Sequence, residues 1–560
     1  MTPRRRRLSL IFAAAGIAVL PLAWRGTSCG HDFDFHLESW MEVLRQWRQG
    51  VVYPHWAASA NYGAGEPRFV FYPPLSWMLG ALLALVMPWI KVPLIFTLIA
   101  LAAMGASFFR MAREWMPGDN AALASCLYVV NPYVLFVAYE RAAYGELLAG
   151  AWIPLLVLFA LRARPAMLEL AMVVAGLWLT NAPAAVMGCY TLMVLVAAAV
   201  VAERRWVLAG RAAGGTALGL GLAGFYLVPA VYEQRWVEIQ RAIGEGMRVE
   251  DSFLFGHTGE AFHDQVLRTA SWIAVVLLAA TVIAAVLSYR TRRRGALWAT
   301  LVALAMMITG LLLPFSDVVW RLAPELKFLQ FPWRWLLVLS MVLAALVGLA
   351  LREGAKTRRG NLQRVAAVVV VAACVSGVAW FYFWQPCDDE DNVRAQVATF
   401  RDGDFEGTDE YTASPADNGA IQQDLPRIRV LRAADGNEGN SAAGTNPEWQ
   451  ASGADLLPSE VQIGRWDVER MSATVRSGGG FAVLRVMDYP AWRVTVNGAG
   501  VDARPRRDDG LMVVPVAAGV SEIAVRYVAT RDVWAGRILS LAGAILWLWL
   551  AARQRRQRIS

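Results

Sequence analysis

Long apolar segments, many of them followed by a short cluster of basic residues, dominate the pattern along this chain. Apolar runs of about 17–25 residues are long enough to cross a bilayer as helices. Because arginine and lysine clusters favour the cytoplasmic side, they indicate which end of each run faces inward. The pattern predicts about twelve spans, at residues 8–24, 93–110, 120–137, 147–161, 166–179, 184–202, 208–229, 269–288, 296–313, 334–351, 364–384 and 535–552.

The apolar run at 73–90 needs a different interpretation. It begins with Pro73 and Pro74, and counting it as a span would move Arg110 and Arg113 to the outer face. We therefore predict a helix that packs at the outer surface or re-enters the membrane there. The dense basic clusters then lie on one side, so that both termini are predicted to be cytoplasmic.

The region between the last two predicted spans has a different pattern. Residues 387–459 are acidic and rich in Gly, Asn and Ser, whereas polar and apolar residues alternate through 467–528. Glycines at 478–480 and the pair Asn497-Gly498 are turn signals between such strands. We predict a transmembrane domain over 1–384 with a first outer loop at 25–92. A β-rich outer domain over 385–534 and a last span with a basic tail over 535–560 follow.

Composition supports a polytopic, mainly α-helical membrane protein. Hydrophobic residues make up 57% of the chain, mean hydropathy is +0.40, and charged residues are 18%, against about 25% in soluble domains. The net charge of +8 comes from clusters that set orientation, so no nucleic-acid partner is expected. Neither a Walker motif nor a strand-linked GxGxxG is present, so no nucleotide cofactor is expected.

The five cysteines include no CxxC pair, which argues against a zinc or redox motif. Cys29 and Cys387 each follow a predicted span on the predicted outer, oxidising side. A disulfide could therefore join the first outer loop to the outer domain.

The polar stretch HDFDFH opens the first outer loop. A helix is predicted over 35–49, where apolar side chains recur on one face and Asp34 can cap the N-terminus. With its tryptophans, this helix should lie along the membrane surface. Asp32, Asp34 and His36 would then be at the outer interface. They could bind a divalent metal ion, or one carboxylate could act as a general base; alternatively, Asp34 is only a cap and Asp32 is solvated.

Other charged residues of the outer loops are candidates for binding a substrate. Arg68 has the forked donors that suit a phosphate, although an arginine among lipid headgroups is an equal alternative. Arg141 and Glu146 lie at the outer ends of two spans, where ionisable groups often serve function. Lys327 and Arg334 flank an aromatic segment, which suits a polyprenyl phosphate or an ordinary interfacial belt with basic anchors.

These motifs also carry a resemblance to known families. The first span, the acidic outer loop, the many later spans and the outer domain look like the GT-C superfamily of membrane glycosyltransferases. The segments HDFDFH, YPHW, GAGEPRFVFYPP, YERAAYGE, LTNAP, LQFPWRW, GTDEYT and DYPAWRVTVNG resemble a bacterial membrane-protein family labelled 6-pyruvoyl-tetrahydropterin-synthase-related. That label implies no pterin chemistry, and no pterin is expected. Homologues often have a histidine at the position of Asn181, so no role is transferred to Asn181.

The resemblance implies an acidic base or metal ligand in the first loop, matching Asp32 or Asp34, and a polyprenyl-phosphate sugar donor. We accordingly expect a glycosyltransferase in a bacterial inner membrane that works on the outer face. Its partners would be membrane lipids, a lipid-linked sugar donor and an envelope glycan, lipid or protein acceptor. The alternatives are a non-enzymatic lipid or polysaccharide transporter and an envelope assembly protein.

Overall fold

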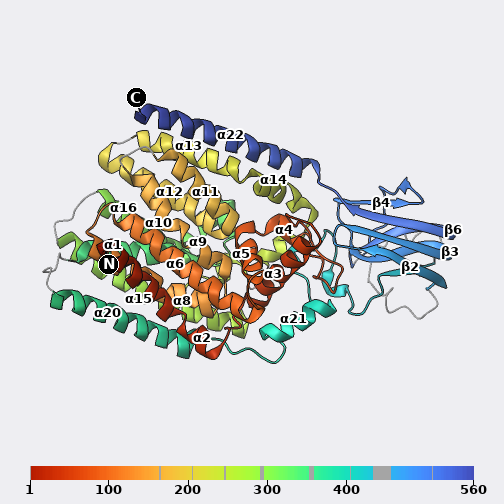
Figure 1. Ribbon diagram of the computed structural model, residues 1–560, viewed down its shortest axis with the longest axis horizontal. Helices are drawn as coiled ribbons and strands as arrows, with labels where there is room; N and C mark the ends of the chain where they lie inside the picture. The colour runs from red at the N-terminus through yellow and green to blue at the C-terminus, as the bar shows by residue number, and fades with distance from the viewer. Residues whose placement is uncertain are drawn as a thin grey trace.

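A helical bundle with a β-sheet projecting from one end forms the molecule (Figure 1). The computed structural model describes residues 2–162, 166–204, 206–244, 247–290, 296–351, 358–403, 405–432, 456–507 and 509–559. Several basic clusters that set the predicted orientation, such as 291–295 and 352–357, lie outside the described residues. The orientation of the termini therefore stays a prediction.

The bundle is built from apolar helices whose positions match the predicted spans. They are α1 (Pro3–Ala18), α2 (Leu20–Arg25), α6 (Val92–Ala112), α7 (Gly118–Val129), α8 (Pro132–Tyr139), α9 (Tyr144–Ala149), α10 (Trp152–Leu161), α11 (Met167–Thr180), α12 (Ala182–Glu203), α13 (Val207–Leu222), α14 (Gly224–Glu233), α15 (Ala261–Arg290), α16 (Ala296–Leu311), α17 (Asp317–Leu322), α18 (Pro324–Lys327), α19 (Leu336–Ala350), α20 (Arg358–Val378) and α22 (Arg531–Ile559). Among the described residues, seven helices are long and apolar enough to cross a membrane, or up to nine if each bent pair is one span. The protein is thus a membrane protein, and the count of twelve stays a prediction.

The span predicted at 208–229 is broken into two helices, and whether it crosses the membrane stays a prediction. α13 and α14 meet at an angle of 76°, and α14 contains Pro229, which cannot donate a helical hydrogen bond. The break follows a glycine-rich stretch, where helix propensity is low. A Cβ on Gly224 would come within 2.9 Å of the Leu539 side chain of α22, so the glycine allows the two helices to approach closely.

The first outer loop folds between the bundle and the sheet (Figure 1). It contains α3 (Phe33–Arg48), α4 (Arg68–Phe71) and α5 (Pro74–Ala84). α5 has 11 residues and is too short to cross a bilayer. This length agrees with the predicted surface or re-entrant helix.

The position predicted for α3 needs correction. It begins at Phe33 with Asp32 as the N-cap residue, so Asp34 lies in the first turn and is not the cap. Most of α3 is buried, and Trp40 stacks on Phe96 of α6 with ring centroids 5.1 Å apart. The helix therefore packs within the protein and does not lie free on a membrane surface.

The predicted β-rich domain is an antiparallel sheet of six strands in the order β1-β3-β6-β4-β5, with β2 also paired to β3. The strands are β1 (Ile428–Leu431), β2 (Ser459–Trp466), β3 (Arg470–Met487), β4 (Trp492–Val496), β5 (Ala499–Gly500) and β6 (Leu511–Tyr527). A short helix, α21 (Val393–Asp402), joins the bundle to this domain. Residues 433–455 of the predicted domain lie outside the described part of the chain.

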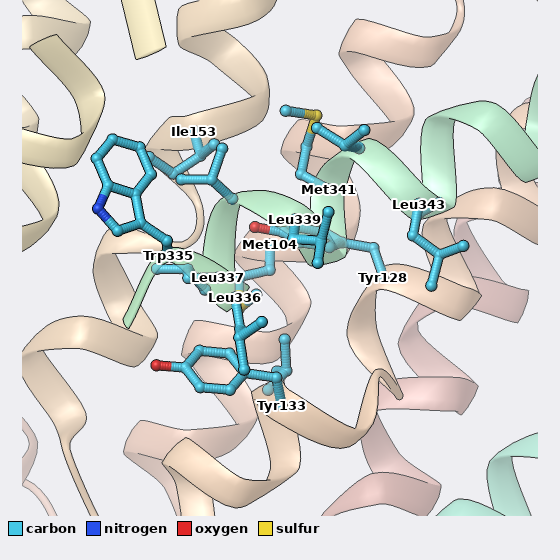
Figure 2. Close-up of a cluster of buried hydrophobic side chains, with 14 of the residues drawn as sticks. Met104, Tyr128, Tyr133, Ile153, Trp335, Leu336, Leu337, Leu339, Met341 and Leu343 are labelled. Atoms are coloured by element: carbon cyan, nitrogen blue, oxygen red, sulfur yellow. The ribbon is translucent and has the colours of Figure 1, made fainter. Parts of the chain in front are cut away.

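The core of the bundle surrounds α19. Figure 2 shows Leu336, Leu337, Leu339 and Met341 packed among side chains of neighbouring helices, and all four are fully buried. A helix that is apolar on every side belongs in the interior. This helix follows directly after Arg334, so the packed core fixes the position of one candidate functional residue.

The predicted disulfide between Cys29 and Cys387 is present, with Cα atoms 5.0 Å apart. Backbone bonds extend the connection, since the Cys29 amide donates to the Gln385 carbonyl at 3.2 Å. The Gln385 side chain donates to Glu140 Oε2 at 3.0 Å. The start of the first outer loop is therefore held against two other segments.

We expect the double change Cys29→Ser and Cys387→Ser to destabilise the protein by about 2–4 kcal/mol, because the bond closes a long loop in the unfolded chain. Thermal unfolding in detergent should occur at a lower temperature. The matched control is Cys126→Ser, which removes a cysteine that is not disulfide-bonded. An unchanged unfolding temperature in the double variant would contradict this expectation.

Candidate functional site

Three segments that are distant in the sequence meet where the first outer loop joins the bundle. The amide of His31 donates to the Glu140 carbonyl at 3.2 Å, and the amide of Asp32 donates to the Arg141 carbonyl at 2.8 Å. A Cβ on Gly30 would lie 2.5 Å from the Glu140 carbonyl oxygen, so only glycine permits this approach. The backbone thus places Asp32 directly beside Arg141.

Arg141 is the centre of a network of buried charges. Its Nη1 lies 2.5 Å from Glu146 Oε2, and its Nη2 lies 3.3 Å from Asp32 Oδ2. Tyr133 donates its hydroxyl to the other Glu146 oxygen at 2.7 Å. The side chains of Arg141 and Glu146 are 5% and 3% exposed, whereas that of Asp32 is 35% exposed. Asp32 is therefore the member of this trio that solvent or a substrate can reach.

Arg334 extends the network from the start of α19. Its Nε lies 3.7 Å from Glu146 Oε2, and its Nη2 donates to the Gln330 side chain at 3.3 Å. Among the described residues, the buried Nε has no hydrogen-bond partner. The rings of Phe331 and Trp333 stack on each other. The Arg334 guanidinium lies 5.0 Å from the centroid of the Phe331 ring, and the Arg141 guanidinium lies 5.0 Å from that of the Trp333 ring. The structure thus brings together four residues predicted from sequence, namely Asp32, Arg141, Glu146 and Arg334.

The electrostatic environment keeps Asp32 ionised. Burial is the largest single effect and opposes its ionisation, but the neighbouring basic groups, with Arg141 foremost, together outweigh it, so the pKa of Asp32 is below its ordinary value. Asp32 therefore presents a negative charge at neutral pH. Such a group can accept a hydrogen bond from a hydroxyl or stabilise a developing positive charge.

His36 belongs to a neighbouring buried cluster. It is 3% exposed, its Nδ1 lies 3.2 Å from the Tyr72 hydroxyl, and burial lowers its pKa to about 4. The ring is therefore neutral at pH 7 and lies against Tyr72 and Tyr144.

The three predicted metal ligands do not form one site. Asp34 is exposed and accepts a hydrogen bond from the Phe35 amide at 2.8 Å, whereas His36 is buried. In the described ranges, no group of three His, Cys, Asp or Glu residues is arranged to hold a metal ion. The predicted set of Asp32, Asp34 and His36 does not fit a metal ion in this arrangement.

The structure places Arg68, predicted to bind substrate, inside a buried ion-pair system, and its substrate-binding role stays a prediction. This side chain is 1% exposed and forms ion pairs with Glu38 at 2.5 Å and Glu66 at 2.6 Å. Its guanidinium lies 4.6 Å from the centroid of the Phe35 ring. Arg68 is thus mainly occupied in joining α3 to the turn before α4.

Lys327 lies apart from the Asp32 network. Its Nζ is 5.1 Å from the centroid of the Phe328 ring. Within the described part of the chain, no hydrogen bond or ion pair joins it to Asp32, Arg141 or Glu146. Its predicted role in substrate binding stays a prediction.

The sequence analysis missed two residues of this region, Tyr133 and Tyr72. Each tyrosine lies next to prolines and apolar residues, so neither stands out as polar. A buried tyrosine hydroxyl needs a hydrogen-bond partner, and this rule is the signal that could have identified both residues. Tyr133 meets that need through Glu146 and Tyr72 meets it through His36.

Comparisons with models of protein families and with curated proteins find no match. Three solved structures are similar to this chain. Arabinofuranosyltransferase AftD from Mycobacteria is 19% identical with a TM-score of 0.44, over 68% of this chain and 27% of AftD. Its mutant R1389S is 15% identical with a TM-score of 0.47, over 94% of this chain and 42% of the mutant. An Archaeoglobus fulgidus oligosaccharyltransferase is 14% identical with a TM-score of 0.41, over 68% of this chain and 57% of the oligosaccharyltransferase.

The chain thus spans less than two thirds of each of these proteins. The resemblance to the GT-C superfamily stays a prediction. Nothing in the comparisons shows the 6-pyruvoyl-tetrahydropterin-synthase-related family, which stays a prediction.

We expect Arg68→Gln to destabilise the protein by about 3–5 kcal/mol, because it leaves two buried carboxylates without their cation. Chemical unfolding in detergent measures this loss. Arg48→Gln is the matched control, since Arg48 is exposed on α3 and should change stability by less than about 0.5 kcal/mol. Wild-type stability in Arg68→Gln would show that this ion-pair system is not structural.

The buried neutral His36 should make stability depend on pH. Between about pH 6.5 and 4, the unfolded chain binds a proton that folded His36 does not, so stability is lost as pH falls. The loss should reach about 2 kcal/mol at pH 5. The His36→Gln variant has no histidine at this position and therefore lacks this pH-dependent loss of stability. Unfolding curves at pH 7.5 and pH 5 should therefore differ less for the variant, and an equal difference for both proteins would argue against a neutral buried histidine.

Proposed function

We propose that this protein is a membrane glycosyltransferase that moves a sugar from a lipid-linked donor to a cell-envelope acceptor. A polyprenyl phosphate is the proposed carrier of the sugar. The proposed location is a bacterial inner membrane, with the reaction on the outer face. The observation that supports this proposal best is the ionised, partly exposed carboxylate of Asp32 above the buried Arg141–Glu146 pair.

The chemistry of sugar transfer requires such a carboxylate. Positive charge develops on the sugar ring in the transition state, and the acceptor hydroxyl must lose a proton as its oxygen attacks. As the acceptor oxygen bonds to the anomeric carbon, the bond from that carbon to the donor phosphate oxygen breaks, and the lipid phosphate leaves with the electron pair. The Asp32 carboxylate accepts the proton of the acceptor hydroxyl. Arg141 holds the carboxylate in place, which lowers the cost of orienting it during the reaction.

The donor phosphate is proposed to bind near Arg334. Its buried Nε lacks a hydrogen-bond partner among the described residues, and a phosphate oxygen would provide one. The neighbouring Phe331 and Trp333 rings offer an apolar wall for the lipid. The scheme assigns no step to a metal ion, and the predicted need for one stays a prediction.

The proposal predicts that Asp32→Asn lowers the rate of sugar transfer by about 10²–10⁴-fold. The test is the incorporation of labelled sugar from lipid-linked donors into the envelope fraction of cells that contain the full-length variant. Membrane levels of the protein should stay normal, because Asp32 is partly exposed and its pair with Arg141 is long.

Two further variants sharpen this test. Asp34→Asn separates the two acidic candidates, and Asp388→Asn is a matched control at an exposed position of the predicted outer domain. Loss of transfer in Asp34→Asn alone would move the base to Asp34. If neither Asp32→Asn nor Asp34→Asn changes transfer, the proposed active site is wrong and the transporter alternative is favoured.

A further inference from the structure

Three cavities follow one another along the edge of the bundle formed by α12, α13, α14 and α22. The first, of about 740 Å³, lies between the sheet and the ends of α14 and α22. The second, of about 970 Å³, lies between α13, α14 and α22 and shares Tyr232 with the first. The third, of about 540 Å³, lies between α12 and α13 and shares Ala217 and Leu220 with the second. We call this series of neighbouring cavities, linked by shared lining residues, the path, and no residue of the Asp32 network lines it.

The two cavities along the helices form an apolar groove at the surface of the bundle. Their linings consist mainly of Ala, Gly, Leu, Val and Met side chains. Val231 is 69% exposed and Trp206 is 74% exposed. Figure 1 places α13, α14 and α22 together at one edge of the bundle. A groove of this kind fits a hydrocarbon chain.

The cavity at the sheet has the opposite chemistry. Five arginines and three aspartates line it. Two of the arginines are in ion pairs, Arg504 with Asp488 at 2.8 Å and Arg507 with Asp509 at 2.9 Å. In the described part of the chain, Arg531 has no ion-pair partner, and it is exposed. A cation is therefore available for an anionic ligand.

Arg235 stands where the apolar groove meets this cavity. It lines the groove and lies 3.5 Å from the centroid of the Tyr232 ring, the side chain that both cavities share. Among the described residues it too has no carboxylate partner. A negative charge at the end of a hydrocarbon chain in the groove would therefore lie near Arg235.

One buried donor of the same cavity lacks a partner. Trp492 Nε1 has no hydrogen-bond partner among the described residues, and Trp492 lines the cavity and is more than nine-tenths buried. The buried Asp532 also lines the cavity and is hydrogen-bonded to Glu233. A headgroup hydroxyl can accept from Trp492, and another can donate to a remaining lone pair of Asp532.

We propose that this path is a binding site for an anionic phospholipid with a hydroxylated headgroup. The acyl chain lies in the groove along α13 and α14, the phosphate lies beside Arg235 and Arg531, and the headgroup hydroxyls reach Trp492 and Asp532. The phospholipid joins the sheet to α14 and α22, and so holds the outer domain on the bundle. This site does not depend on the proposed sugar transfer.

The test uses the full-length protein in nanodiscs that contain phosphatidylglycerol and phosphatidylcholine in equal amounts. Mass spectrometry of the lipids that remain bound after transfer to detergent should show a preference for phosphatidylglycerol. Each basic residue near an anionic lipid contributes a factor of about 5 in binding. Arg235→Gln with Arg531→Gln should therefore reduce the preference roughly 20-fold.

A matched control removes two other exposed arginines of the sheet, Arg465→Gln with Arg476→Gln, and should leave the preference unchanged. A second variant tests the groove without altering charge. A Cβ on Gly221 meets no atom within 4 Å, so Gly221→Phe can fill the groove without a backbone clash. It should reduce retention of both lipids.

Equal retention of the two phospholipids by the wild type, or an unchanged preference in the arginine variant, would overturn the proposal. Displacement of phosphatidylglycerol by an equal amount of polyprenyl phosphate would overturn the assigned occupant. Asp32→Asn should bind phosphatidylglycerol like the wild type, so a failure of the proposed sugar transfer is distinguishable from a failure of this site.

Discussion

A guanidinium group that is buried away from water needs a carboxylate partner to neutralise its charge. Arg141 is such a group, because its side chain is buried where the first outer loop meets the bundle. A buried ion pair is costly to form and much more costly to break. Arg141 meets the requirement with Glu146 from its own helical hairpin and Asp32 from the first outer loop. If the loop left the bundle, Arg141 would keep Glu146 but lose the second carboxylate and the backbone contact with Asp32. This constraint fixes the position of the one carboxylate in the trio that a substrate can reach.

The rest of the first loop is arranged so that this contact is rigid. Arg68 ties α3 to the turn before α4 through Glu38 and Glu66, and the Cys29–Cys387 disulfide ties the start of the loop to the segment after α20. Rigid support of this kind reduces the cost of orienting a reactive group. Two ionic clusters and one covalent bond thus act on a single short segment.

The features predictable from sequence were those that depend on local composition. Apolar runs placed the helices, alternation placed the sheet, and the shared outer side of Cys29 and Cys387 suggested their bond. The roles of the arginines were not predictable in this way. Arg68 and Arg141 both stand beside glutamates in outer loops, yet one is enclosed by its own loop and the other contacts a distant aspartate. Only the tertiary packing separates them.

The acidic pair of the first loop shows why spacing alone misleads at a helix start. Successive residues of an α-helix are rotated by about 100°, so side chains two positions apart project in nearly opposite directions. Asp32 is the N-cap residue, and its amide is bonded to the Arg141 carbonyl, which directs its side chain toward the network. Asp34 lies in the first turn and is exposed. While α3 begins at Phe33, the two carboxylates therefore do not act together on one ligand. A substrate would meet a single carboxylate of this pair.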